Sequence, residues 1–184
     1  MPVQTMWILG ILLILAAGWL IGSTVTSWWK YRGERIVRCP ENQRPAGVRV
    51  DAGHAGLTAI GKSPELRLNS CSRWPERAGC GQACLAQIEA SPHDCLVRTI
   101  LVKWYQDKSC VSCGRPFGDI EWTGAKPALK TEDQSLVEWS QVPAERLEET
   151  LATARPICFA CYTATRLVRE HPDLAIDRTR PIPR

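Results

Sequence analysis

The chain begins with a long apolar segment. Residues 6–26 contain no charged side chain and consist mostly of Ile, Leu, Ala, Gly and Trp. About 20 apolar residues in a helix cross a hydrocarbon core of roughly 30 Å. Trp7 lies near one end of the segment, and Trp28, Trp29 and Tyr31 follow its other end, where aromatic rings prefer the membrane interface. The pattern predicts a transmembrane anchor over residues 1–29.

A cleaved signal peptide is the competing interpretation of this segment. Such a peptide needs a basic n-region, but residues 1–5 contain no Lys or Arg, and the apolar run is longer than a usual h-region. Four positive charges follow the run directly, at Lys30, Arg32, Arg35 and Arg38. By the positive-inside rule, we expect a single-pass protein of the inner or cytoplasmic membrane, with its N-terminus outside and its C-terminal domain in the cytoplasm.

Alternating and helical patterns follow the anchor. Val48–Asp51 and Leu66–Asn69 alternate apolar and polar residues, which predicts two half-buried strands. Cys84–Ile88 predicts a short helix that closes the first module, residues 30–91. Ser91-Pro92 is a good start for a longer helix that runs to about Tyr105. The apolar stripe of that helix consists of Leu96, Val97, Ile100, Leu101 and Trp104. We expect it to brace the first module against a second one, residues 92–170.

The second module has weaker patterns. Residues 120–122 and 136–139 read as short strands around the turn-like residues 131–135. Residues 144–154 have apolar positions on one side and predict a helix, and Cys161–Glu170 predicts a last helix that ends at His171-Pro172. The tail, residues 171–184, has three prolines and three arginines and should be extended, either solvated or in contact with lipid phosphates or an acidic partner. The fold class is therefore α+β.

The amino-acid composition is rich in cysteine and poor in histidine. The 184 residues have a formal net charge of +4, which gives no polyelectrolyte signature, and they include nine cysteines but three histidines. That ratio favours thiolate coordination or disulfides over histidine-based catalysis. Because a cytoplasm keeps thiols reduced, the predicted topology favours metal ligands or free thiols.

Two Cys-x-x-Cys pairs carry the clearest chemistry. Cys110 and Cys113 are followed by Gly114, which permits a tight turn, and Cys158 and Cys161 begin the last helix. Each pair can bring two thiolates to one tetrahedral ion. A knuckle, a hairpin and a helix that carries the second pair resemble the treble-clef or zinc-ribbon family over residues 110–170. The resemblance implies one structural Zn²⁺ held by these four cysteines. The 44 residues between the pairs (114–157) exceed the roughly 15–20 of the simple spacing rule, and the helix at 144–154 accounts for the excess.

A second set of cysteines is dense but irregular. It consists of Cys39, Cys71, Cys80 and Cys84. These residues can hold a second zinc ion or an iron–sulfur cluster, or they can be buried small side chains without a metal. Cys95 is the odd ninth thiol. Together with His93 it can replace one ligand of this set, although a plainly packed thiol is the simpler interpretation.

The sequence does not favour an enzyme. It has no Gly-rich phosphate loop, no nucleophile elbow and no metal-binding His pair with an intervening Glu. The leading hypothesis is a membrane-anchored structural zinc protein that serves as an accessory or interaction subunit of a larger membrane complex, respiratory or photosynthetic. Gly18 and Gly22 form a small-xxx-small pair that can admit another helix. An iron–sulfur electron carrier is the first alternative. A tethered nucleic-acid-binding zinc protein is the second, and Arg166 and Arg169 alone do not give it a basic face. No small-molecule substrate is indicated.

Overall fold

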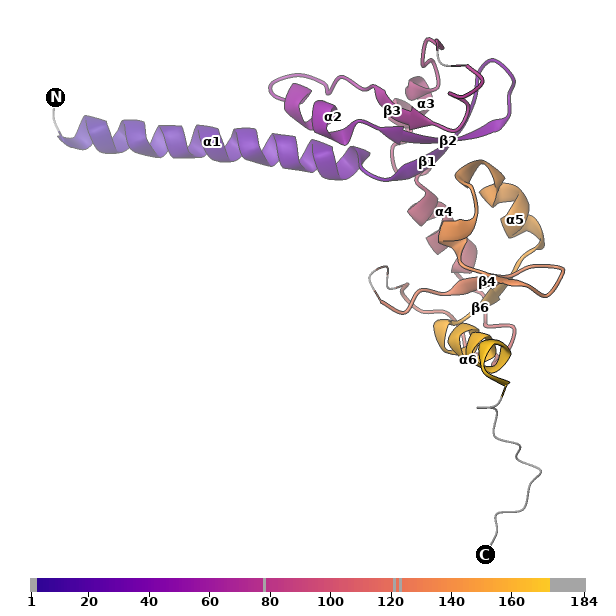
Figure 1. The fold of residues 1–184 in the computed structure, drawn as a ribbon. Coiled ribbons are helices and arrows are strands. Elements are labelled where there is room, and N and C mark those ends of the chain that lie inside the picture. The colour runs from indigo at the N-terminus through magenta and orange to yellow at the C-terminus, as the bar shows by residue number, and fades with distance from the viewer. Residues whose placement is uncertain (1–2, 78, 121, 123, 173–184) are drawn as a thin grey trace, which may run out of the picture. The chain divides into compact units, whose positions relative to one another are not determined.

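The computed structural model describes residues 3–77, 79–120, 122 and 124–172. The chain forms two compact units, Met1–Ile100 and Leu101–Arg184, which are described separately below. Both mix helices with a small antiparallel sheet, as expected for an α+β protein (Figure 1). The predicted extended tail falls almost wholly on residues 173–184, which lie outside the described residues.

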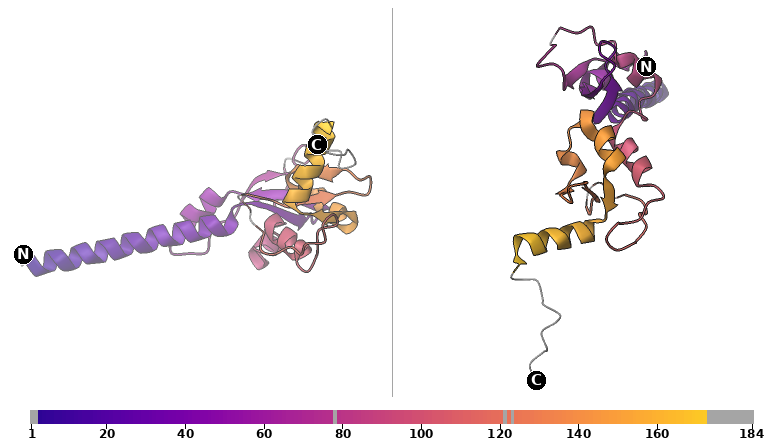
Figure 2. Two further views of the ribbon diagram at one scale, coloured as in Figure 1. Left: turned by 90° about the horizontal axis from the view of Figure 1, so that it is seen from below. Right: turned by 90° about the vertical axis from the view of Figure 1, so that its right-hand side faces the viewer.

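The first unit begins with helix α1, Val3–Tyr31. Within it, Met6–Tyr31 is long and apolar enough to cross a membrane, and the most apolar part of this segment is not buried in the protein, whereas Tyr31 at its end is buried. Figures 1 and 2 show α1 projecting from the rest of its unit. Large apolar side chains are therefore exposed along most of its length, as the apolar run in the sequence predicts. A membrane is the environment in which such a surface is stable.

The rest of the first unit is a three-stranded antiparallel sheet with two short helices. The strands β1 (Glu34–Arg38), β2 (Pro45–Val50) and β3 (Leu68–Cys71) lie in the order β1-β2-β3. Both strands expected in this region are confirmed, with β2 starting earlier and β3 starting later than predicted. Helix α3, Leu85–Ala90, confirms the short helix after Cys84. The core of the unit gathers Val37, Val48, Leu68 and Ile88 between sheet and helix.

Helix α2, Ala52–Thr58, lies against the C-terminal end of α1 (Figure 1). The sequence did not predict it, because Gly and Ala in this stretch gave no helical pattern. A Cβ atom added at Gly56 would be 3.0 Å from the carbonyl oxygen of Thr24 and 3.5 Å from Cβ of Trp28. The glycine therefore permits the backbones of the two helices to approach closely.

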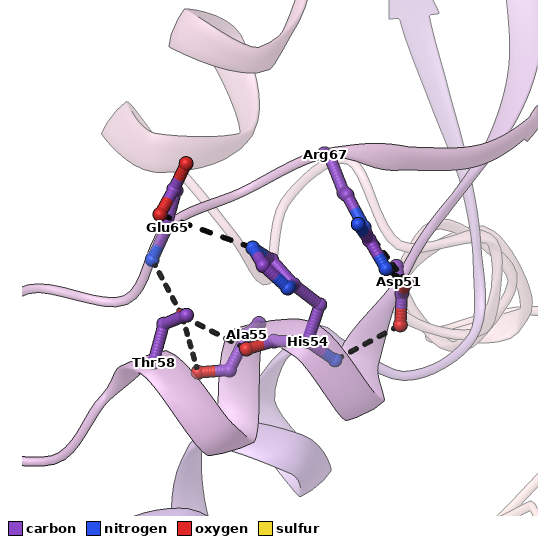
Figure 3. Close-up of polar contacts among 6 residues, drawn as sticks. All are labelled: Asp51, His54, Ala55, Thr58, Glu65 and Arg67. Carbon is purple, nitrogen blue, oxygen red and sulfur yellow. Dashed lines mark hydrogen bonds and ion pairs between the residues drawn. The ribbon is translucent and has the colours of Figure 1, made fainter.

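A polar network holds α2 and the segment that follows it (Figure 3). Asp51 caps the helix, since its Oδ1 accepts a 2.9 Å hydrogen bond from the backbone N–H of His54. Its Oδ2 accepts two more from Arg67, at 2.9 Å from Nε and 2.7 Å from Nη2. Thr58 Oγ1 accepts a 2.9 Å hydrogen bond from the N–H of Glu65. These contacts close the connection between α2 and β3.

The helix predicted from Ser91 begins six residues later than expected. Ser91 is the C-cap of α3, and helix α4 covers Val97–Tyr105. The intervening residues are drawn to the edge of β1, where the N–H of Ile36 donates a 2.8 Å hydrogen bond to the carbonyl oxygen of Cys95. Strand-edge pairing therefore overrides a good capping sequence. The boundary between the two units, at residues 100 and 101, falls within α4.

The second unit contains a sheet in the order β5-β4-β6. Its strands are β4 (Ala128–Lys130), β5 (Leu136–Val137) and β6 (Arg155–Ile157), and its helices are η1 (Trp139–Gln141), η2 (Ala144–Arg146), α5 (Leu147–Thr153) and α6 (Phe159–Glu170). The predicted helices at 144–154 and 161–170 are confirmed. The buried hydroxyl of Tyr105 donates a 2.9 Å hydrogen bond to the carbonyl oxygen of Ala128. This bond attaches the end of α4 to the central strand.

The strand predicted at 120–122 is wrong. Neither Ile120 nor Trp122 belongs to a strand, and the hairpin strand forms instead at β4. Trp122 packs its ring edge-on against Trp139, with ring centroids 5.4 Å apart. The apolar pattern there reflects a ring contact, not strand pairing. Leu129 in β4 is fully buried and pairs on both sides, which is why the sheet is centred on it.

Candidate metal centre

The first Cys-x-x-Cys pair lies on a tight turn. The N–H of Cys110 donates a 2.8 Å hydrogen bond to the carbonyl oxygen of Arg115, and the N–H of Gly114 donates one of 2.8 Å to the carbonyl oxygen of Cys110. Gly114 has φ +71°, a conformation that favours glycine. A β-bridge between Ser109 and Pro116 closes the turn at its base. The predicted tight turn behind the two sulfurs is thus confirmed.

The second pair is placed by a strand and a helix. Strand β6 leads into Cys158, the N-cap of α6, and Cys161 lies in the first turn of that helix. The N–H of Val111 donates a 2.9 Å hydrogen bond to the carbonyl oxygen of Pro156, which ties the turn to β6. The N–H of Cys158 approaches Cys110 Sγ at 3.3 Å. These contacts between segments far apart in the sequence bring the two pairs together.

The four sulfur atoms form one cluster. The Sγ atoms of Cys110, Cys113, Cys158 and Cys161 all lie within 4.8 Å of one another. Cys113 Sγ and Cys158 Sγ are 3.8 Å apart. A tetrahedral zinc ion with Zn–S bonds of about 2.3 Å requires sulfur–sulfur separations of about 3.8 Å. The cluster therefore fits a tetrahedral thiophilic ion with small adjustments, and these four residues are the ones that would hold it.

The thiols of the cluster differ in how readily they ionise. Burial opposes ionisation of Cys110, but backbone N–H groups, with Cys158 first among them, outweigh it and lower the pKa of Cys110 to about 6. A hydrogen bond to Cys158, together with burial and the other neighbouring thiols, raises the pKa of Cys161 to about 12. Several thiolates cannot accumulate here without a cation, because like charges at this distance repel. A divalent ion bound among the four sulfurs would supply that cation.

The cluster lies at the edge of the core of the second unit. Cys110 is buried, Cys158 and Cys161 are half-buried, and Cys113 is exposed. Ala128, Ile157 and Tyr162 form the buried core beside the sulfurs, with partly buried apolar side chains around them. The hydroxyl of Tyr162 donates a 3.2 Å hydrogen bond to Glu138 Oε1, which also ties α6 to the segment before η1. Loss of the cluster would therefore disturb packing as well as coordination.

The second set of cysteines is also brought together, though less closely. Cys39, Cys71, Cys80 and Cys84 all line one cavity of about 70 Å³ in the first unit. Burial raises the pKa of the Cys84 thiol above its ordinary value, and the other thiols of the set add to the effect. Among the residues that the structure describes, these four do not form a second cluster as tight as the first.

Cys95 is placed apart from both sets. Neither Cys95 nor His93 is among the residues that line the cavity. Cys95 packs against the core of the first unit, and its thiol donates to the carbonyl oxygen of Ser91 at 3.4 Å. The structure therefore favours the packed thiol, the simpler interpretation of the sequence, over the alternative of a replacement ligand. All nine cysteines are free thiols in this structure, so none of them forms the disulfides of the alternative interpretation.

Sequence reasoning missed Arg73 beside the second set. Its Nη1 donates a 2.7 Å hydrogen bond to Cys39 Sγ and lies 3.7 Å from Glu41 Oε2. Burial opposes ionisation of Cys39, but hydrogen bonds from the backbone of Glu41 and from Arg73 outweigh it and hold the pKa of Cys39 below its ordinary value. The signal in the sequence was the position of Arg73, two residues after Cys71.

Comparison of the chain with protein-family models, with curated proteins and with solved structures found no match.

Proposed function

We propose that the protein is a membrane-anchored structural zinc protein without enzymatic activity, and that it serves as an accessory subunit of a larger membrane complex. The observation that carries the proposal is the cluster of four sulfurs within 4.8 Å of one another, in a chain whose N-terminal helix is long and apolar enough to cross a membrane. We propose that this complex is a respiratory or photosynthetic assembly.

A structural role for the ion follows from its four ligands. Catalytic zinc sites keep one position open for water or substrate, whereas structural sites are closed by four protein ligands. Here all four positions of a tetrahedron are cysteines. The order of a knuckle, an antiparallel strand pair and a helix with the second thiol pair at its start resembles a treble clef. We identify the ion as Zn²⁺ because zinc is the common partner of four cysteines in a reducing compartment.

The contact role rests on α1. Gly18 and Gly22 lie on one side of this helix, and nothing lies within 4 Å of a Cβ atom added at either position. Small residues four apart let a second transmembrane helix approach closely. We propose that this surface binds a helix of the partner complex. The anchor would then raise the effective concentration of the soluble contacts, so each of them can be weak.

Mild detergent extraction followed by native sizing tests this role. We expect the protein to migrate with a larger complex and the double variant Gly18→Leu/Gly22→Leu to migrate alone. Ala16→Leu, on the opposite side of α1, is the matched control and should remain in the complex. If the wild type always migrates alone, the accessory-subunit proposal is wrong.

Metal analysis of the purified protein tests the zinc site separately. We expect Cys113→Ser to hold one zinc ion fewer than Cys95→Ser, since Cys95 packs away from the cluster. Zinc content that is equal in the two variants would remove the basis of the proposal.

A further inference from the structure

The turn that follows β1 repeats the backbone of the metal-binding turn in the other unit. The N–H of Gln43 donates a 2.8 Å hydrogen bond to the carbonyl oxygen of Cys39, and the N–H of Cys39 donates one of 2.9 Å to the carbonyl oxygen of Arg44. The turn at Cys110 has the same two bonds at the same offsets, from Gly114 and to Arg115. In each case the cysteine is the first residue of the turn.

The dihedral angles and the sulfur contacts match as well. Gln43 has φ +58° and Gly114 has φ +71°, and both stand four residues after the cysteine. A left-handed conformation is uncommon for Gln, so the hydrogen bonds of the turn must stabilise it at Gln43. In both turns the backbone N–H groups two and three residues after the cysteine favour its thiolate form and contribute to its lowered pKa. Asn42 occupies the position that Cys113 occupies in the other turn.

The other three thiols of the set arrive from elements comparable to those of the second unit. Cys71 ends strand β3, and Cys84 is the N-cap of α3, as Cys158 is the N-cap of α6. Cys80 lies on the loop between them. With Cys39 they line one cavity of about 70 Å³, which is large enough to admit an ion. The turn at Cys39 lacks a second thiol, but three other cysteines line the same cavity.

Two further groups at the cavity are suited to metal-bound thiolates. Trp74 lines it, and its Nε1–H is buried without a hydrogen-bond partner among the described atoms. Buried donors are normally satisfied, and a thiolate sulfur is an acceptor. Arg73 already donates to Cys39 Sγ at 2.7 Å. Four thiolates around one divalent ion leave excess negative charge, which a guanidinium beside the site offsets.

We propose that Cys39, Cys71, Cys80 and Cys84 form a second metal centre that binds one Zn²⁺ ion, with the turn at Cys39 as its knuckle. Ion binding draws the four sulfurs to tetrahedral distances, and Trp74 Nε1–H and the Arg73 guanidinium donate to them from outside. The centre does not depend on the C-terminal one, since none of its ligands belongs to the second unit.

The zinc content of the full chain, purified in detergent under reducing conditions, tests the centre. We expect two zinc ions per chain in the wild type and in the control Cys95→Ser, and one in Cys39→Ser and in Cys80→Ser. Cys113→Ser should also hold one, and Cys39→Ser/Cys113→Ser none. A wild type with one zinc ion that Cys39→Ser retains would overturn the centre. A wild type with one zinc ion that is lost in Cys39→Ser but kept in Cys113→Ser would instead refute the C-terminal site.

A rescue variant separates coordination from misfolding. If the turn at Cys39 is a knuckle, a thiol at position 42 points at the ion as Cys113 does. Asn42→Cys should therefore restore the second zinc ion to Cys80→Ser, whereas Asn69→Cys, on the exposed side of β3, should not. Failure of Asn42→Cys to restore zinc overturns the knuckle. Iron and inorganic sulfide in the purified wild type, with broad visible absorption, would overturn the single-ion centre in favour of a cluster.

Discussion

The guanidinium of Arg35 donates a 2.6 Å hydrogen bond to the carbonyl oxygen of Tyr31, the last residue of α1. Arg35 belongs to β1 and is fully buried. A second 2.6 Å bond runs from the same side chain to the carbonyl oxygen of Lys30. The last carbonyl groups of a helix lack partners within the helix, and a cation is favourable there. One side chain therefore caps α1 and joins it to the sheet.

Replacement of Arg35 should detach the anchor from its unit. Arg35→Leu leaves the terminal carbonyl groups of α1 buried without donors, and each such group costs about 1–3 kcal/mol. We expect a loss of about 2–4 kcal/mol in the stability of the first unit, measured by denaturant unfolding in detergent. Arg49→Leu, at an exposed position on β2, is the control and should change little. Equal stabilities of the two variants would contradict the capping role.

Gly56 sets the distance between α2 and α1. Because a Cβ atom at this position would be 3.0 Å from a backbone oxygen of α1, the neighbour cannot rotate away. Gly56→Val should cost about 1–3 kcal/mol through overpacking and should increase hydrogen exchange throughout α2. Gly53→Ala is the control in the same helix, since the nearest atom to a Cβ there, Asp51 Oδ1, is at 3.4 Å, an ordinary van der Waals contact. Unchanged exchange in Gly56→Val would show that the two helices separate easily.

Helix α1 and the two Cys-x-x-Cys pairs were predictable because each depends on local sequence. An uninterrupted apolar run specifies α1 without reference to the rest of the chain, and Cys-x-x-Cys with a following Gly specifies the turn at Cys110. Helix α2 was not predictable in this way. Its Gly and Ala residues have no amphipathic pattern, and it forms because Asp51 caps it and Gly56 fits against α1.

The turn at Cys39 was also not predictable from local sequence. Its sequence, Cys-Pro-Glu-Asn-Gln, lacks both the second cysteine and the glycine by which the turn at Cys110 is recognised. The backbone bonds that reveal it depend on the approach of Arg44 as β2 begins, which is a tertiary feature. For the same reason, the sequence could name four cysteines as a set but could not say which one leads a knuckle.

Acid should loosen α2 through Asp51. The backbone N–H of His54, first, and then Arg67 hold the pKa of Asp51 below its ordinary value. A carboxylate with a lowered pKa in the folded state stabilises the fold above its unfolded pKa of about 3.9, and this contribution is lost as the pH falls through the folded value. We therefore expect exchange in α2 to rise below about pH 4. Asp51→Asn keeps a capping oxygen and should abolish this step. A step of the same size in that variant would assign it to another group.

Removal of one ligand of the C-terminal cluster should unfold the second unit. In small sites of this kind the free energy of metal binding is largely free energy of folding. Cys113→Ser, or a strong chelator added to the wild type, should abolish the protection of α6 and β6 from hydrogen exchange. Ser112→Ala, the neighbouring exposed position, should keep it. Persistent protection after demonstrated loss of zinc would mean that packing around Ile157 and Tyr162 suffices without the ion.

The orientation of the chain in the membrane is testable at Cys113, whose side chain is exposed. Arg35 is buried as a helix cap and so cannot contact lipid headgroups, but Arg32 is exposed, with its guanidinium 4.0 Å from the ring centroid of Trp29. The remaining positive charge still follows α1, and the positive-inside rule still predicts a cytoplasmic C-terminal domain. A membrane-impermeant thiol reagent should therefore leave Cys113 unlabelled in intact cells after the metal is removed with a permeant chelator, and should label it after lysis. Labelling of intact cells would place the nine thiols in an oxidising compartment. Disulfides would then replace metal ions as the expected links between them.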